Sequence, residues 1–197
     1  MLKKYNNIEN EIGIDEAGRG PLIGRVYAGA VVWPIDLDGS NIIKDSKKLS
    51  PKKRKIALEW IKKNIPIWSY GYSEAEDIDS MNILEATKMA MQRAIDKIGD
   101  NYSLIIDGVG WEKKFKTYNT TSIPQGDSKY YSIAAASIIA KEYHDEYIRE
   151  LCKDNPDLDT KYGLLSNMGY GTKKHLEGIK LHGISSFHRK SFKCCQL

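Results

Sequence analysis

Residues 13–21 read Gly-Ile-Asp-Glu-Ala-Gly-Arg-Gly-Pro, in which an apolar strand end is followed by two acidic residues and a glycine-rich turn. We expect the strand to cover about residues 11–14, because Gly18 and Gly20 favour a turn. If the strand continued, Asp15 and Glu16 would point to opposite faces. Adjacent carboxylates beside a turn with unobstructed backbone N–H groups suit a metal site that faces a phosphate. An ordinary solvated strand end explains the two acidic residues equally well when they are taken alone.

The 197-residue chain has the length of one domain, and we assign residues 1–197 to it. Its three cysteines, Cys152, Cys194 and Cys195, lack metal-ligand spacing and favour free thiols in a reducing compartment. Residues 1–10 are too polar for a secretory leader, and no apolar run reaches the roughly 18 residues of a membrane span. We therefore expect a cytoplasmic protein that does not enter the membrane.

Charge is distributed unevenly along the chain, although 30 basic and 26 acidic residues give a net charge of only +4. Residues 44–63 contain nine Lys or Arg, and residues 172–193 contain six. Two basic patches of this kind suit a polyanion such as nucleic acid. Either patch alone is explained as well by a solvated lysine-rich surface.

The order of predicted elements is that of an α/β protein with a mixed sheet. Further strands are expected at 25–33, 67–72 and 104–107, and helices at 51–63, 79–98, 132–152 and 172–181. The small residues at 132–140 indicate that this helix packs closely on the sheet. Residues 153–169 have turn composition and lead into a small C-terminal region.

Two further carboxylates stand at the ends of predicted elements. Leu-Ile-Ile-Asp-Gly at 104–108 has the form of a buried strand that carries Asp107 at its C-terminal end. If this strand neighbours the first one, Asp15 and Asp107 lie together. Asp127 falls at or just before the start of the 132–152 helix, where the helix dipole favours a negative charge.

Seven blocks of this sequence, in order, resemble the ribonuclease HII family, the type 2 ribonucleases H. They lie at residues 13–21, 45–50, 78–83, 105–108, 126–141, 169–172 and 187–192. The related ribonuclease HIII has a different turn after its Asp-Glu pair and an added N-terminal domain, so the resemblance favours HII. One departure is visible at 142–145, where Glu-Tyr-His-Asp replaces the family's usual valine followed by an Arg-Asp pair. This departure puts a local helix contact in doubt.

The resemblance implies a ribonuclease H-like fold, with a mixed five-stranded sheet flanked by helices and a small helical substrate-binding region at about 153–197. It implies an endonuclease that cuts RNA in RNA/DNA hybrids and 5′ to single ribonucleotides embedded in duplex DNA, leaving 5′-phosphate and 3′-hydroxyl ends. The implied catalytic residues, which hold two Mg²⁺ or Mn²⁺ ions, are Asp15, Glu16, Asp107 and Asp127. The implied sensor of the 2′-hydroxyl is the turn Gly18, Arg19 and Gly20, and Tyr170 is implied to pack on the following sugar.

Elementary electrostatics agrees with a metal site. Two carboxylates about 4 Å apart repel by roughly 1 kcal/mol in water and about 4 kcal/mol at an effective dielectric constant of 20. Two divalent cations relieve this repulsion and support phosphodiester hydrolysis. Ligands that are all oxygen favour Mg²⁺ or Mn²⁺ over zinc.

Other residues receive weaker assignments. The expected phosphate contacts are Lys47, Lys48, Lys173, Lys174 and Arg189. His175 and His188 receive no catalytic role, because a histidine in a basic segment is more often a structural partner.

Two alternatives stay open at this point: another metal nuclease of the same fold, which would cut all-DNA duplexes, and a non-catalytic binder of hybrids. The expected partner is nucleic acid. We expect a monomer, and no dependence on a sliding clamp, because the C-terminus lacks a Gln box with paired aromatics.

Overall fold

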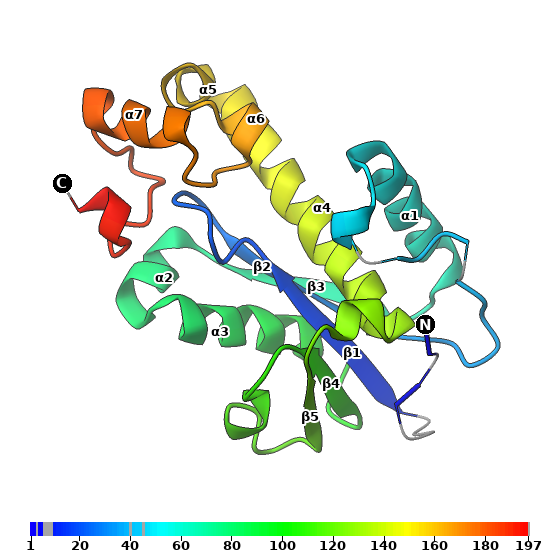
Figure 1. Cartoon of the computed structure of the whole chain (residues 1–197). Coiled ribbons are helices and arrows are strands. Elements are labelled where there is room, and N and C mark those ends of the chain that lie inside the picture. Colours follow the sequence, from blue (N-terminus) through cyan, green and yellow to red (C-terminus); the bar gives the residue numbers. More distant parts are fainter. Residues whose placement is uncertain (3, 6–9, 40, 45, 197) are drawn as a thin grey trace.

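The computed structural model describes residues 1–2, 4–5, 10–39, 41–44 and 46–196, without the side chain of Lys47. Its centre is a mixed five-stranded sheet with the order β3-β2-β1-β4-β5 (Figure 1). The strands are β1 Glu11–Ala17, β2 Val26–Val32, β3 Trp68–Ser73, β4 Ser103–Asp107 and β5 Thr120–Ile123. The first four match the predicted strands. The sequence alone had not located β5, which is short and mostly polar.

The pairing of β1 with β4 decides where the acidic residues meet. β1 runs antiparallel to β2 and parallel to β4, with Ile14 opposite Ile106. The next residues along the two strands are Asp15 and Asp107, so the two acidic residues stand at the same edge of the sheet. The sequence predicted this proximity only if the two strands were neighbours, and the observed pairing meets that condition. β1 extends to Ala17, beyond the expected end at residue 14.

Helices cover both faces of the sheet. Those of the described chain are α1 Pro51–Asn64, α2 Ala75–Met81, α3 Ile83–Asp96, α4 Tyr131–Asp154, α5 Pro156–Tyr162, α6 Leu164–Asn167 and α7 Lys173–His182, with 3₁₀ turns at Ser46–Lys48, Trp111–Lys113, Gly126–Ser128 and Lys193–Cys195. One apolar core lies between α3 and the sheet, and a second lies beneath α1 and α4 (Figure 1). None of the helices in the described chain is both long and apolar enough to cross a membrane.

Close packing of α4 on the sheet depends on residues without side chains. A Cβ added at Gly13 would lie 2.4 Å from Ser132, and one at Gly29 would lie 2.3 Å from the carbonyl oxygen of Ala136. α4 therefore approaches β1 and β2 more closely than any larger residue at either glycine permits. The small residues at 132–140 had predicted this contact.

The predicted helix at 79–98 is wrong in one respect, because it is two helices. Asn82 has a positive φ of 73° with ψ of 163° and separates α2 from α3. Its side chain accepts hydrogen bonds from Leu84 N at 2.9 Å and Glu85 N at 3.2 Å, which caps α3. The break therefore occurs without a glycine or proline, at a residue whose side chain caps the second helix.

The segment 153–169 was expected to consist of turns, and it instead forms α5 and α6. Pro156 occupies the first turn of α5, where a missing N–H costs nothing, and Gly163 in the left-handed region ends that helix. Together with α7 these helices build a third apolar core, which includes Leu158, Tyr162 and Ile179. The C-terminal region is therefore helical.

Candidate active site

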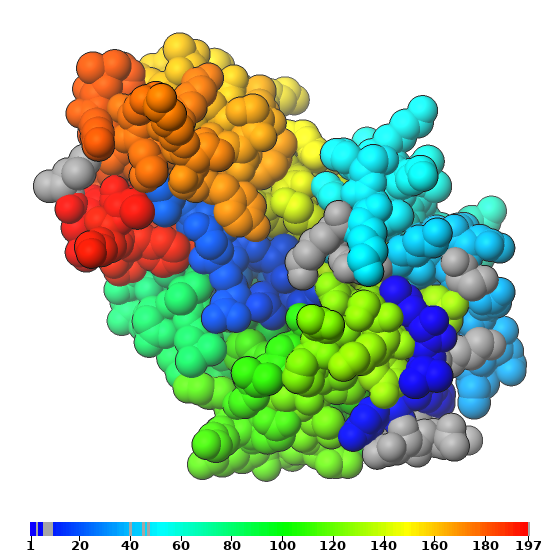
Figure 2. Space-filling view, in the orientation of Figure 1, coloured from blue at the N-terminus to red at the C-terminus, as the bar shows by residue number. Residues whose placement is uncertain are grey.

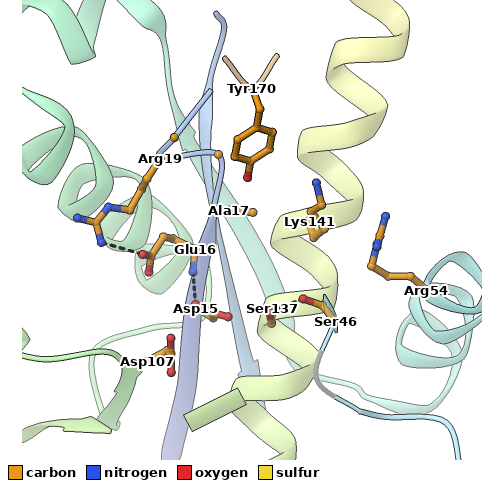
Figure 3. A pocket seen from close by; sticks show the side chains of 12 residues that line it. Asp15, Glu16, Ala17, Arg19, Ser46, Arg54, Asp107, Ser137, Lys141 and Tyr170 are labelled. Atoms are coloured by element: carbon orange, nitrogen blue, oxygen red, sulfur yellow. Dashed lines mark hydrogen bonds and ion pairs between the residues drawn. The ribbon is translucent and has the colours of Figure 1, made fainter. Parts of the chain in front are cut away.

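A cavity of about 260 Å³ opens at the edge where β1 and β4 end (Figure 3). It is lined by Asp15, Glu16, Ala17, Gly18, Arg19, Gly20, Ser46, Arg54, Asp107, Ser137, Lys141 and Tyr170. Figure 2 shows the blue segment around the β1–β2 connection in a hollow, between the orange C-terminal helices and the cyan segment before α1. Residues far apart in the sequence thus meet at one concave site.

Asp15 is the most enclosed of the lining carboxylates, with 5% of the residue exposed. Its carboxylate accepts a hydrogen bond from the hydroxyl of Ser137 on α4, and Ser137 Oγ lies 2.9 Å from Ser46 Oγ. Burial raises the pKa of Asp15 well above its usual value, and the nearby charges of Glu16 and Asp107 raise it further. The Glu16 N–H also donates to Asp15 Oδ1 at 2.8 Å, and these two hydrogen bonds only partly offset the effect of burial on the Asp15 pKa.

Glu16 leaves β1 on the opposite face from Asp15, as expected for a strand that continues. Its Oε1 accepts a hydrogen bond from Arg19 Nη1 at 3.0 Å. Within the described residues its Oε2 is buried and has no hydrogen-bond partner. Burial raises the pKa of Glu16, although Arg19 opposes this shift. The charge of Asp107 also raises the Glu16 pKa, and an unpartnered buried carboxylate oxygen near another carboxylate is a free ligand position for a cation.

Asp107 connects the end of β4 to the turn that carries Asp127. The Gly126 N–H donates to Asp107 Oδ1 at 2.6 Å, and Trp111 Nε1 donates to the Asp107 carbonyl oxygen at 2.9 Å. Asp127 follows Gly126 in a 3₁₀ turn and is 4% exposed. Three predicted catalytic residues therefore line the cavity, whereas the fourth, Asp127, is buried beside it and is not part of the lining.

The glycine turn and Tyr170 face each other across the mouth of the cavity. A Cβ added at Gly20 would lie 3.2 Å from Tyr170 Cε1, so the aromatic ring rests directly over this glycine. Lys141 Nζ lies 5.6 Å from the centre of the same ring. Gly18 has a φ of +89°, a conformation that favours glycine. The predicted substrate-binding residues of the turn and Tyr170 are thus brought together (Figure 3).

The predicted role of Arg189 is corrected by the structure. It was predicted to contact phosphate, but the residue is 0% exposed and its guanidinium is bound by backbone carbonyls. A side chain in this position does not reach a bound duplex. The position in a basic segment suggested a surface role, and the sequence held no indication that the arginine would be enclosed.

Lys48, Lys173 and Lys174 do not line the cavity. Lys48 is exposed in the 3₁₀ turn before α1, and Lys173 and Lys174 are exposed in the first turn of α7. Lys173 Nζ lies 3.8 Å from Glu177. The side chain of Lys47 lies outside the described residues. Their phosphate contacts stay predictions.

Five lining residues were missed as site residues, namely Ala17, Ser46, Arg54, Ser137 and Lys141. Arg54 is buried, and it donates from Nε to Glu142 at 2.5 Å and from Nη2 to Asp145 at 3.0 Å. This network occupies the segment where the sequence departs from the family pattern. Arg54 lay within the first basic patch, and the other missed residues lay within the blocks that resemble the family. Position within these segments was therefore the one feature of the sequence that could have identified them as site residues.

The observed sheet order, with acidic residues at adjoining strand ends beside a glycine turn and cationic side chains, defines a hydrolase of phosphate diesters with an α/β fold. The comparisons with known proteins then specify the family. A family model described as Ribonuclease HII matches residues 12–195. The chain belongs to the ribonuclease HII family, and as a member it is an endoribonuclease that acts on RNA/DNA hybrids.

Relatives of similar length support this assignment. A ribonuclease HII from Phocaeicola vulgatus is 43% identical over 98% of this chain and 94% of its own length. One from Rickettsia conorii is 44% identical over 98% of this chain and 95% of its own. Among solved structures, ribonuclease H2 from Pyrococcus horikoshii has a TM-score of 0.72 at 23% identity over 95% of both chains. The ribonuclease HII of the PCNA complex from Archaeoglobus fulgidus has a TM-score of 0.73 at 26% identity, covering 93% of this chain and 95% of that one.

The family is metal-dependent, and the residues at the cavity fit a hard divalent ion. Asp15, Glu16 and Asp107 present oxygen donors only, and Glu16 Oε2 has no other partner among the described residues. No three acidic, histidine or cysteine side chains of the described chain are already drawn into a ligand cluster.

Proposed function

We propose that this endoribonuclease cuts 5′ to a ribonucleotide, either within a hybrid or at a single ribonucleotide embedded in duplex DNA, and leaves 5′-phosphate and 3′-hydroxyl ends. Removal of embedded ribonucleotides from DNA would be its biological task. The observation that carries the proposal is the shared cavity of Asp15, Glu16 and Asp107 beside the Gly18–Gly20 turn.

The proposed ligands of two Mg²⁺ or Mn²⁺ ions are Asp15, Glu16 and Asp107. Asp127 is the proposed fourth carboxylate, and the N–H of its neighbour Gly126 donates to Asp107. When bound, such ions activate the attacking water and stabilise the leaving 3′-oxygen. Asp15 and Glu16 must be ionised to bind them, although burial raises the pKa of both. Ser137 favours the ionised form of Asp15 through its hydrogen bond. Arg19 does the same for Glu16.

Recognition of the ribonucleotide is proposed for the turn and Tyr170. The 2′-hydroxyl is the group that separates RNA from DNA at a given position, so a site without base preference must contact the sugar. Backbone groups of Gly18, Arg19 and Gly20 line the cavity without a side chain in the way at either glycine. Tyr170 rests over Gly20 and offers an aromatic face to the next sugar. Specificity for the sugar rather than the base follows.

Affinity for the duplex is proposed to come from exposed cations, which neutralise phosphates and release counterions. Lys48 precedes α1, and Lys173 and Lys174 follow Tyr170 at the start of α7. Lys47 is assigned the same role from sequence. Residues 153–197 would thus form a substrate-binding part of a single domain, 1–197.

We further propose a monomer that works without a sliding clamp and resides in the cytoplasm. The last proposal is supported by the free thiols of Cys152, Cys194 and Cys195.

The experiment is cleavage of two matched duplexes, one with a single ribonucleotide and one of DNA alone, in Mg²⁺ and in Mn²⁺. The proposal expects one incision 5′ to the ribonucleotide and none in the DNA duplex. Asp107→Asn should abolish incision while duplex binding persists, with exposed Asp36→Asn as the control. Cutting of the all-DNA duplex would favour another nuclease of this fold, and binding without incision would favour a non-catalytic binder.

A further inference from the structure

The side chain of Arg189 uses its whole hydrogen-bonding capacity on one loop. It is 0% exposed, and all five of its N–H groups reach carbonyl oxygens of the β1–β2 connection. Nε donates to Gly24 at 2.9 Å, Nη1 to Arg19 at 3.0 Å and to Pro21 at 2.7 Å, and Nη2 to Gly18 at 2.7 Å and to Arg25 at 2.9 Å.

These bonds determine which way the turn presents its N–H groups. A trans peptide is planar, so its N–H points opposite to its C=O. The carbonyls of Gly18 and Arg19 point to the guanidinium, and the N–H groups of Arg19 and Gly20 in the same two peptides therefore point away from it. Both residues line the cavity. Arg189 thus orients the donors that the proposed function assigns to the ribonucleotide.

The residue before Arg189 reaches the other half of the recognition site. His188 Nδ1 accepts from the Ser185 N–H at 2.9 Å, so its proton must lie on Nε2. His188 Nε2 lies 3.1 Å from His175 Nε2, which must then accept. The remaining proton of His175 is on Nδ1, which donates to the Tyr170 carbonyl oxygen at 3.0 Å. One consistent set of neutral tautomers therefore links His188 to the backbone of Tyr170.

The environment keeps this chain neutral. Both imidazoles are 0% exposed. Burial lowers the pKa of His175, and it lowers the pKa of His188 to about 4. A proton added to His175 would place two N–H donors against each other between the Nε2 atoms. A proton added to His188 would sit on Nδ1, against the Ser185 N–H.

We propose that His188 and Arg189 are positioning residues that set both halves of the ribonucleotide-recognition site, Arg189 through the glycine turn and His188 through His175 and Tyr170. The two halves meet where the Tyr170 ring lies over Gly20. Figure 1 shows the red C-terminal segment beside the connection of β1 and β2. A single short segment therefore fixes the turn and the tyrosine relative to each other. The inference rests on the proposed function of these two elements.

The test compares Arg189→Lys and His175→Asn with the controls Arg149→Lys and His182→Asn, both at exposed positions. Lysine keeps the charge but has neither the planar fork nor five donors. Incision of the single-ribonucleotide duplex is measured at saturation, per molecule competent to bind the duplex. We expect kcat to fall about 10- to 100-fold in Arg189→Lys and about 10-fold in His175→Asn. KM should stay near that of the wild type, because the exposed phosphate contacts are unchanged.

A second readout uses the wild type with ¹⁵N-labelled histidine. NMR should find His188 protonated at Nε2 and His175 protonated at Nδ1 at neutral pH. Wild-type kcat in both variants, or the opposite tautomers, would overturn the proposal. If Arg189→Lys does not fold, the proposal is tested by kcat of His175→Asn and by the histidine tautomers in the wild type. A wild type that fails to cut at the ribonucleotide refutes the proposed function instead, and the tautomer result is independent of that outcome.

Discussion

Replacement of Asp107 by asparagine should stabilise the protein in the absence of divalent ions. The Gly126 N–H donates to Asp107 Oδ1 at 2.6 Å, and an asparagine oxygen accepts the same bond. The variant therefore removes a charge and keeps the contact. Its main consequence is the loss of repulsion between Asp107 and the carboxylates of Asp15 and Glu16, whose pKa values its charge raises.

Coulomb's law gives the size of the effect. Two charges about 4 Å apart repel by about 4 kcal/mol at an effective dielectric constant of 20 and by about 1 kcal/mol in water. The cavity is open to solvent, so we expect a gain of about 1–2 kcal/mol at pH 8. With a urea m-value of about 2 kcal/mol/M, the unfolding midpoint should rise by about 0.5–1 M.

The effect should depend on pH with a definite sign. Carboxyls whose pKa is raised in the folded state contribute stability that is complete below their unfolded pKa and is lost as pH rises through the folded one. The gain from Asp107→Asn should therefore vanish near pH 4, where the carboxyls are protonated in the folded state, and grow towards pH 8. Added Mg²⁺ should reduce the stability difference between the variant and the wild type, because the wild type binds the ion more strongly.

The assay is urea unfolding with a chelator or with Mg²⁺ at several pH values, using Asp36→Asn as the control for charge at an exposed site. A variant less stable than the wild type in chelator at pH 8, or a gain that does not vary with pH, would refute the reasoning.

Three further substitutions test the electrostatics and packing. Burial raises the Glu11 pKa to about 7, so the wild type should lose about 2 kcal/mol of stability as the pH rises from 4.5 to 7. Glu11→Gln should not show this loss, and a pH profile of unfolding equal to that of the wild type would contradict the assignment. Arg54→Met should lower the free energy of unfolding by about 3–5 kcal/mol, because it removes the cation that pairs with buried Glu142 and one of the two that pair with Asp145, where Lys141 remains. Thermal unfolding equal to that of the wild type would exclude that role. Gly29→Ala should cost about 3 kcal/mol or more, because its Cβ would meet an α4 carbonyl at 2.3 Å, and a neutral result in urea would show that α4 shifts freely.

The strand edge that carries the acidic residues was predictable from sequence. Asp15 and Asp107 each follow a short apolar run, and parallel neighbours place such residues at one edge. The small residues at 132–140 likewise predicted the close contact of α4 with the sheet. In both cases the local sequence was enough for the prediction, because a carboxylate at a strand end and a run of small side chains each restrict the structure by their chemistry and size.

Features that depend on tertiary contact were not predictable. Asn82 separates two helices by adopting a positive φ, which no periodicity reveals. Arg189 reads as a surface cation, yet carbonyls more than 160 residues away in sequence enclose it. The fifth strand, Thr120–Ile123, has too little apolar character to stand out. The metal-ligand role of Asp127 stays a prediction, and its burial in a 3₁₀ turn could not be inferred from helix-start chemistry.

The central claim, that Asp15, Glu16 and Asp107 jointly bind divalent ions beside the glycine turn, is tested most directly by anomalous diffraction from crystals containing Mn²⁺ and a ribonucleotide duplex. The account predicts Mn²⁺ peaks within about 2.0–2.6 Å of carboxylate oxygens from Asp15 and Asp107, and their loss in Asp107→Asn. Peaks bound elsewhere, or unchanged occupancy in the variant, would contradict it.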